Sequence, residues 1–102
     1  MREGGYSTIE MVECMQRERA AWDALRDRYA TRLRTRESPT QVERLEAYLA
    51  ENENWAEAKC AYRASMYEGG TAAGLNGEGC LEENSAEIAI LLHGRVWDYD
   101  HR

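Results

Sequence analysis

The chain has 102 residues, a formal net charge of −6, an apolar fraction of 43% and no Phe. A single domain of this size buries only a modest core, but the apolar fraction is high enough to argue against wholesale disorder. The chain contains no apolar run near the ~20 residues that span a bilayer. Residues 45–102 hold eleven acidic and four basic residues, a net charge of −7, so this half should repel nucleic acid and anionic membranes.

The first predicted helix begins after a capping box, in which Ser7 and Glu10 satisfy each other's backbone N–H groups. No Gly or Pro follows until Pro39, so we expect a helix from Thr8 to Arg36 and a flexible N-terminus at residues 1–6. Its apolar stripe comprises Met11, Met15, Trp22, Leu25, Tyr29 and Leu33.

The second predicted helix begins at a second capping box, with Ser38 as the N-cap, Pro39 at the first helical position and Gln41 closing the box. It should end near Glu68, with Gly69 in the left-handed cap position. Because the link between the two helices is about two residues long, they must run antiparallel. The expected inner face comprises Val42, Leu45, Leu49, Ala56, Cys60, Arg63 and Tyr67.

The segment from Thr71 to Gly79 is rich in glycine, which predicts a loop. A third helix should then begin between Cys80 and Ser85 and stop near Gly94, leaving residues 95–102 as a tail that folds back through Trp97 and Tyr99. Its expected apolar face comprises Ile88, Leu91 and Leu92.

The three cysteines, Cys14, Cys60 and Cys80, fit no zinc pattern, since no C-x-x-C is present. A disulfide between Cys60 and Cys80 would close the glycine-rich segment and stabilise the fold by about 3 kcal/mol in the chain-entropy model. Two buried thiols in a cytosolic helical protein remain the alternative. The sequence thus predicts an all-α fold over residues 1–102, a long antiparallel helical hairpin plus a third, disulfide-tethered helix.

A family resemblance is carried by Cys60, by the run Tyr-Glu-Gly-Gly-Thr at residues 67–71, and by Cys80-Leu81 with an apolar helix behind it. Glu10-Met11 before Cys14 agree in outline. From these residues the chain resembles the LprI-type lysozyme inhibitors, small helical domains of the bacterial cell envelope, over roughly residues 7–92. It departs from them where an aromatic–Arg–Asp run is usual, because residues 55–57 read Trp-Ala-Glu.

The resemblance implies a Cys60–Cys80 disulfide, an unpaired Cys14, and a periplasmic or otherwise exported protein whose leader, with or without a lipid anchor, is absent from this chain. It further implies a binding protein that inhibits a basic, lysozyme-like muramidase. The acidic second half would attract such a partner. The expected contact residues are Glu68, Gly69, Gly70, Thr71, Asn76, Glu78, Glu82 and Glu83. The competing interpretation is that the glycines only make a turn and the acidic side chains are solvated.

Two other kinds of binding protein fit the sequence: an immunity protein that neutralises a delivered toxin, and a structural domain of the cell envelope. Nucleic-acid binding through Arg28, Arg32 and Arg36 is less favoured than ion pairing of these side chains with acidic residues such as Glu43 and Glu46. We expect no enzyme, cofactor or metal site. The glycine run at residues 69–74 is not a phosphate loop, because it follows a helix instead of the strand that such a loop requires.

Overall fold

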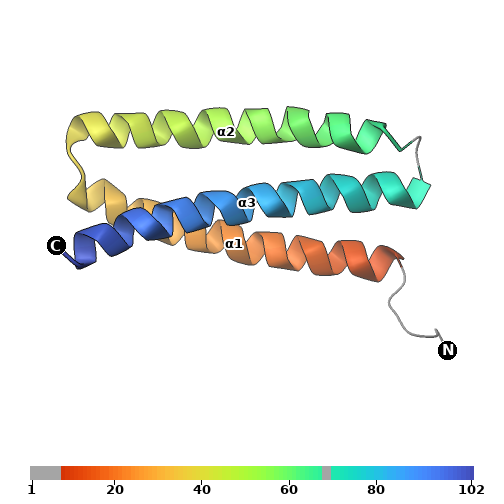
Figure 1. Ribbon diagram of the computed structural model, residues 1–102, viewed down its shortest axis with the longest axis horizontal. Helices are drawn as coiled ribbons and strands as arrows, with labels where there is room; N and C mark the ends of the chain where they lie inside the picture. The colour runs from red at the N-terminus through yellow and green to blue at the C-terminus, as the bar shows by residue number, and fades with distance from the viewer. Residues whose placement is uncertain (1–7, 68–69) are drawn as a thin grey trace.

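A computed structural model of the protein describes residues 8–67 and 70–102, which form three α-helices and no strand. Helix α1 spans Thr8–Arg36, α2 spans Pro39–Ser65 and α3 spans Gly70–Asp100 (Figure 1). The all-α prediction is therefore confirmed. The predicted flexible N-terminus at residues 1–6, the Ser7 cap, and the calls on Glu68 and Gly69 lie outside the described residues.

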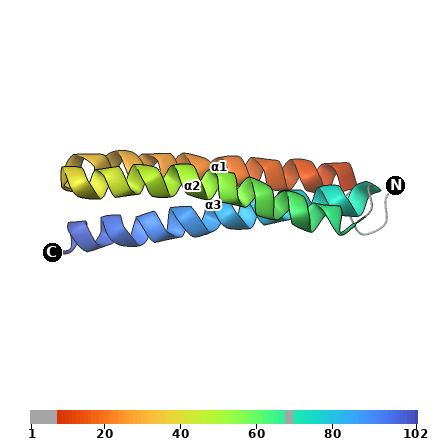
Figure 2. The ribbon, with the colours of Figure 1, turned by 90° about the horizontal axis from the view of Figure 1, so that it is seen from above.

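The predicted hairpin is present, but α3 lies between its two arms. Helices α1 and α2 run antiparallel and touch each other little, whereas α3 packs closely against α1 and also against α2 (Figures 1 and 2). The molecule is elongated and flat, with extents of 53 × 28 × 15 Å. Because α3 contacts both other helices, it is the element on which their mutual placement depends.

The turn between α1 and α2 has the geometry that its sequence predicts. Ser38 Oγ accepts a hydrogen bond from the Gln41 backbone N–H at 3.2 Å, and Gln41 Oε1 accepts one from the Ser38 backbone N–H at 3.2 Å. Pro39 occupies the start of α2, where its missing N–H costs no hydrogen bond. The capping box thus satisfies backbone donors that the first helical turn leaves unpaired.

The predicted glycine-rich loop is wrong, because α3 already begins at Gly70, which has a φ of +74°. Glycine costs about 1 kcal/mol in a helix interior relative to alanine, and that local cost favoured a loop. The packing of α3 against the other two helices overrides this cost. A Cβ on Gly77 would lie 3.4 Å from the Ala64 Cβ, and one on Gly79 would lie 3.9 Å from the Met15 Sδ. Gly77 and Gly79 therefore face α2 and α1, at distances where an added Cβ would make ordinary van der Waals contact.

The expected stop at Gly94 and the separate tail are also wrong, since α3 continues to Asp100. A Cβ on Gly94 would meet no atom within 4 Å, and the helix passes through this position without a break. Tyr99 packs against the core as predicted, but from within the helix, whereas Trp97 is 52% exposed.

The main apolar core lies toward the end of the molecule that carries the α1–α2 turn and draws on all three helices. It comprises Ala30, Leu33, Leu45, Ile88, Leu92 and Val96, with Tyr29, Tyr48, Leu49 and Tyr99 packed around it. Leu91, expected in the core, is 56% exposed. The buried stripe of α3 instead advances through Ile88, Leu92 and Val96, and residue 91 falls outside this stripe.

The other end of the molecule is closed by the predicted disulfide, which is confirmed. Cys60 of α2 and Cys80 of α3 are joined, with 5.5 Å between their Cα atoms, and both side chains are buried. Cys14 is free and exposed. The covalent link joins two helices where little of the main core reaches.

The arginines of α1 form ion pairs, but not all with the predicted partners. Arg32 and Arg36 both bind the Asp100 carboxylate at the end of α3. The bond to Glu46 comes from Arg34, whose Nε and Nη2 atoms lie 2.7 and 2.8 Å from its oxygens. Arg32 and Arg36 pair with α3 because α3, and not α2, packs along α1.

Candidate functional site

The residues predicted to contact a partner lie mostly on the first turns of α3, not on a loop. Gly70 opens the helix, and Asn76 donates a hydrogen bond from Nδ2 to the Ala72 carbonyl oxygen at 3.0 Å. Thr71 belongs to the same first turn. Glu68 and Gly69 are not among the described residues.

Glu78, one of these acidic residues, lies in the contact between α3 and α1. Its side chain is only 11% exposed, and its Oε1 lies 2.7 Å from the Nε of Arg19. This ion pair fastens the start of α3 to α1. The charge of Glu78 is therefore already matched within the protein.

Glu82 and Glu83 follow one turn later and differ in environment. A hydrogen bond with the carboxyl group of Glu18, followed by burial and the nearby charges of other glutamates, raises the pKa of Glu82 above its usual value. Glu83 is 69% exposed and lies 3.8 Å from Arg63. Of the two, Glu83 presents the more accessible carboxylate.

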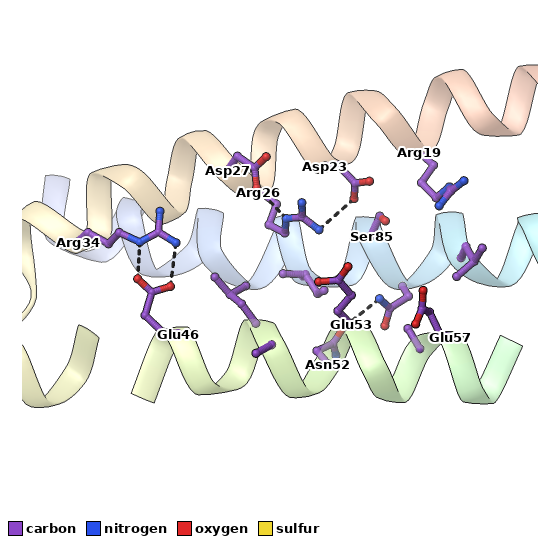
Figure 3. A pocket seen from close by; sticks show the side chains of 16 residues that line it. Arg19, Asp23, Arg26, Asp27, Arg34, Glu46, Asn52, Glu53, Glu57 and Ser85 are labelled. Carbon is purple, nitrogen blue, oxygen red and sulfur yellow. Dashed lines mark hydrogen bonds and ion pairs between the residues drawn. The ribbon is translucent and has the colours of Figure 1, made fainter. Parts of the chain in front are cut away.

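A groove that the sequence did not predict lies between α1 and α2, with α3 as its floor (Figure 3). Its volume is about 420 Å³. The α1 wall comprises Arg19, Asp23, Arg26, Asp27 and Arg34. The α2 wall comprises Glu46, Leu49, Ala50, Asn52, Glu53, Ala56 and Glu57, and the floor comprises Leu81, Asn84, Ser85 and Ile88. The groove exists because α1 and α2 are held apart by α3.

Every arginine in the groove has a carboxylate partner. Arg34 binds Glu46 through two hydrogen bonds, which raise the pKa of Arg34 and lower that of Glu46. Arg26 lies 3.3 Å from Asp23 and 3.0 Å from Asp27, and Arg19 pairs with Glu78. The three positive charges of the lining are thus already neutralised.

Glu53 and Glu57 remain on the opposite wall. They lie one helical turn apart on α2, and neither has an ion pair among the residues that the structure describes. In total the lining holds three guanidinium groups and five carboxylates, an excess of two negative charges. The groove therefore favours cations over anions.

Asn84 and Ser85 place polar groups in the floor of the groove, although Asn84 is only 7% exposed and Ser85 only 5%. Asn84 donates from Nδ2 to Asn52 Oδ1 at 2.9 Å. The Oδ1 of Asn84 is buried and has no hydrogen-bond partner in the described part of the chain. Leaving a buried acceptor unpaired costs about 1–3 kcal/mol, so a donor that reached this oxygen would remove that cost.

The sequence contained partial signals for the groove. Glu53 and Glu57 share a helix face, and the pair Asn84-Ser85 precedes an apolar stretch of the last helix. Neither signal predicts a groove by itself, because the groove depends on the position of α3 between α1 and α2. Only the placement of three helices brings the two walls and the floor together.

Among residues 8–67 and 70–102, no group of three or more His, Cys, Asp or Glu side chains is arranged to hold a metal ion. None of the described helices is long and apolar enough to cross a membrane.

Comparison with known protein families gives a match. The family model described as "Lysozyme inhibitor LprI" matches residues 2–90, which reach from the N-terminal segment to the middle of α3 and include both disulfide cysteines. Neither the curated proteins nor the solved structures contain a match.

Proposed function

Because the chain belongs to the lysozyme inhibitor LprI family, we propose that it binds a lysozyme-like, peptidoglycan-cleaving enzyme and inhibits it. The family match over residues 2–90 is the observation that carries this proposal. The match covers α1, α2 and α3 as far as residue 90, so it concerns most of the scaffold and not one short motif.

The charge of the molecule supports a basic partner. The net charge is −6, and residues 45–102 alone carry −7. Opposite charge raises the rate at which two proteins meet and favours correctly oriented encounters. Lysozymes tend to be basic, so an acidic inhibitor would associate with them rapidly at low ionic strength.

The proposed contact surface is the half of the molecule that contains the disulfide. It includes the predicted residues of early α3, of which Glu83 is well exposed. The disulfide holds α2 and α3 together there, which limits the conformational entropy lost when a partner binds. It also supports export, since disulfides persist in the periplasm and outside the cell.

A lysis assay tests the proposed function. The protein is added in increasing molar ratio to a c-type lysozyme, and the clearing of a bacterial cell-wall suspension is followed by turbidity. We expect the lytic rate to fall as the inhibitor is added, and to recover as salt is raised, because salt screens the attraction between opposite charges. An unchanged rate at a large molar excess, tested with lysozymes of several types, would contradict the proposal.

A further inference from the structure

The groove between α1 and α2 has the features of a binding site for one basic side chain. Its arginines form ion pairs with carboxylates of the protein, whereas Glu53 and Glu57 have no such partner among residues 8–67 and 70–102. Its volume of about 420 Å³ lies in the lower part of the range of about 300–1,000 Å³ that is usual for ligand sites. A long, single side chain fits such a space better than a helix would.

The floor supplies the second, independent observation. The carbonyl oxygen of Asn84 lies beneath the groove surface without a hydrogen-bond partner among the described residues, and Asn84 is only 7% exposed. A rotation about the Cβ–Cγ bond of Asn84 can turn this oxygen toward a donor above it, at the cost of lengthening the 2.9 Å hydrogen bond from Nδ2 to Asn52. Guanidinium and ammonium groups carry hydrogen-bond donors and no acceptor. They therefore suit an acceptor oxygen without a partner in a groove that is also lined by carboxylates.

We propose that the groove receives a lysine or arginine side chain of the protein that this chain binds, with the cationic head between Asn84, Glu53 and Glu57. The aliphatic stem of the side chain would pack on the apolar part of the lining, at Leu49 and Ile88. The inference rests on the proposed function, because it assigns the recognition element of that same basic partner.

Competing occupants are less consistent with the site. An anion would face an excess of two carboxylates, and the guanidinium groups that could bind it would have to leave Asp23, Asp27, Glu46 or Glu78. A purely apolar side chain would leave the Asn84 oxygen unpaired and the two glutamates desolvated, which is unfavourable. The charge and the hydrogen-bonding pattern therefore both select a cation.

A titration followed by NMR tests the site without a protein partner. Agmatine, which carries a guanidinium group on an aliphatic chain, is added to the ¹⁵N-labelled protein, and acetate is added to a parallel sample. We expect agmatine to cause saturable shifts of the side-chain amide signals of Asn84 and Asn52, and acetate to cause none. Absence of a saturable shift with agmatine, or a larger shift with acetate, would overturn the assignment.

A second experiment uses two variants with equal net charge. The double variant Glu53→Gln/Glu57→Gln removes two charges from the groove, and the control Glu43→Gln/Glu51→Gln removes two from exposed positions of α2 outside its lining. All four positions are exposed, so both variants should fold, which circular dichroism checks. We expect the groove variant to weaken inhibition of a c-type lysozyme at least about tenfold, and the control to change it about twofold or less.

The outcomes separate the two proposals. Equal losses in both variants would mean that only net charge matters, which would overturn the groove site and leave the inhibitor function intact. If the unmodified protein fails to inhibit any lysozyme, the proposed function is lost, and the agmatine titration still decides whether the groove binds a cationic side chain.

Discussion

Glu82 shows how one residue of α3 weakens the contact between α3 and α1 at neutral pH. Its carboxyl group lies against that of Glu18, and its pKa is raised because the shared hydrogen bond requires a proton. The folded protein therefore holds this proton more tightly than the unfolded chain does. Its contribution to stability is present at low pH and is lost as the pH rises through the raised pKa.

We expect Glu82→Gln to raise the melting temperature at pH 7, because the amide cannot ionise and can donate a hydrogen bond to Glu18. The gain should shrink near pH ~4, where the acid itself becomes protonated in both states. Thermal unfolding at the two pH values measures this, with Glu83→Gln as the control, since Glu83 is 69% exposed. A lower melting temperature for Glu82→Gln at pH 7 would contradict the interpretation.

At the residue scale, the sequence could predict contacts that follow from local or pairwise rules. The Ser38 capping box depends on residues three positions apart, and the Cys60–Cys80 disulfide depends on spacing and family resemblance. The pair Arg19–Glu78 could not be predicted. It depends on the rotation of α3 against α1, which no short-range pattern specifies.

At the scale of the element, α3 contains glycines that have different roles. Gly77 and Gly79 face neighbouring helices, whereas a Cβ on Gly94 would meet nothing within 4 Å. A glycine without such a neighbour only loosens the helix, because it gives the unfolded chain extra conformational freedom.

We expect Gly94→Ala to increase the free energy of unfolding by about 0.5–1 kcal/mol, measured from urea denaturation. Gly77→Ala is the matched control, because its new methyl group would lie 3.4 Å from the Ala64 Cβ and should offset part of the same gain. If Gly94→Ala destabilised the protein, position 94 would have a role in packing or binding that its open surroundings do not indicate.

The helix boundaries show which elements a sequence can specify. The start and end of α1 and the start of α2 were predicted at the right residues, because Thr8, Arg36 and Pro39 lie beside capping boxes or at a proline. The first ten residues of α3 were missed. Their glycines are poor helix formers, and the segment is helical because it packs against the other helices, as at Gly77, Gly79 and the Arg19–Glu78 ion pair.

For the whole molecule, stability is divided between two ends. The main core cluster lies toward the α1–α2 turn, and the disulfide holds the opposite end, where Cys60 and Cys80 are buried. Removal of the disulfide should therefore loosen most the end of the molecule that lies away from the α1–α2 turn.

We expect Cys60→Ala/Cys80→Ala to lower the free energy of unfolding by about 3 kcal/mol, as the chain-entropy model gives for a loop of this size. Urea denaturation measures the loss, and a reductant should produce a similar loss in the unmodified protein and none in the double variant. Cys14→Ser is the control, because this thiol is free and exposed. Equal stability of the double variant and the unmodified protein would contradict this account.

The overall class and the helical hairpin were predictable, since they follow from the apolar periodicity and the two-residue link. The position of α3 between the two arms of the hairpin was not predictable, because the same apolar pattern allows a third helix to pack on either face of a hairpin. The groove is a property of that placement, and so it emerged only at this scale.

The scarcity of contacts between α1 and α2 has a consequence for how the chain matures. The first two helices leave the ribosome before the one against which both pack, and alone they have little to bury. Compact structure must wait until synthesis is nearly finished. Such a delay would suit the proposed export, in which the disulfide forms after the chain has crossed a membrane.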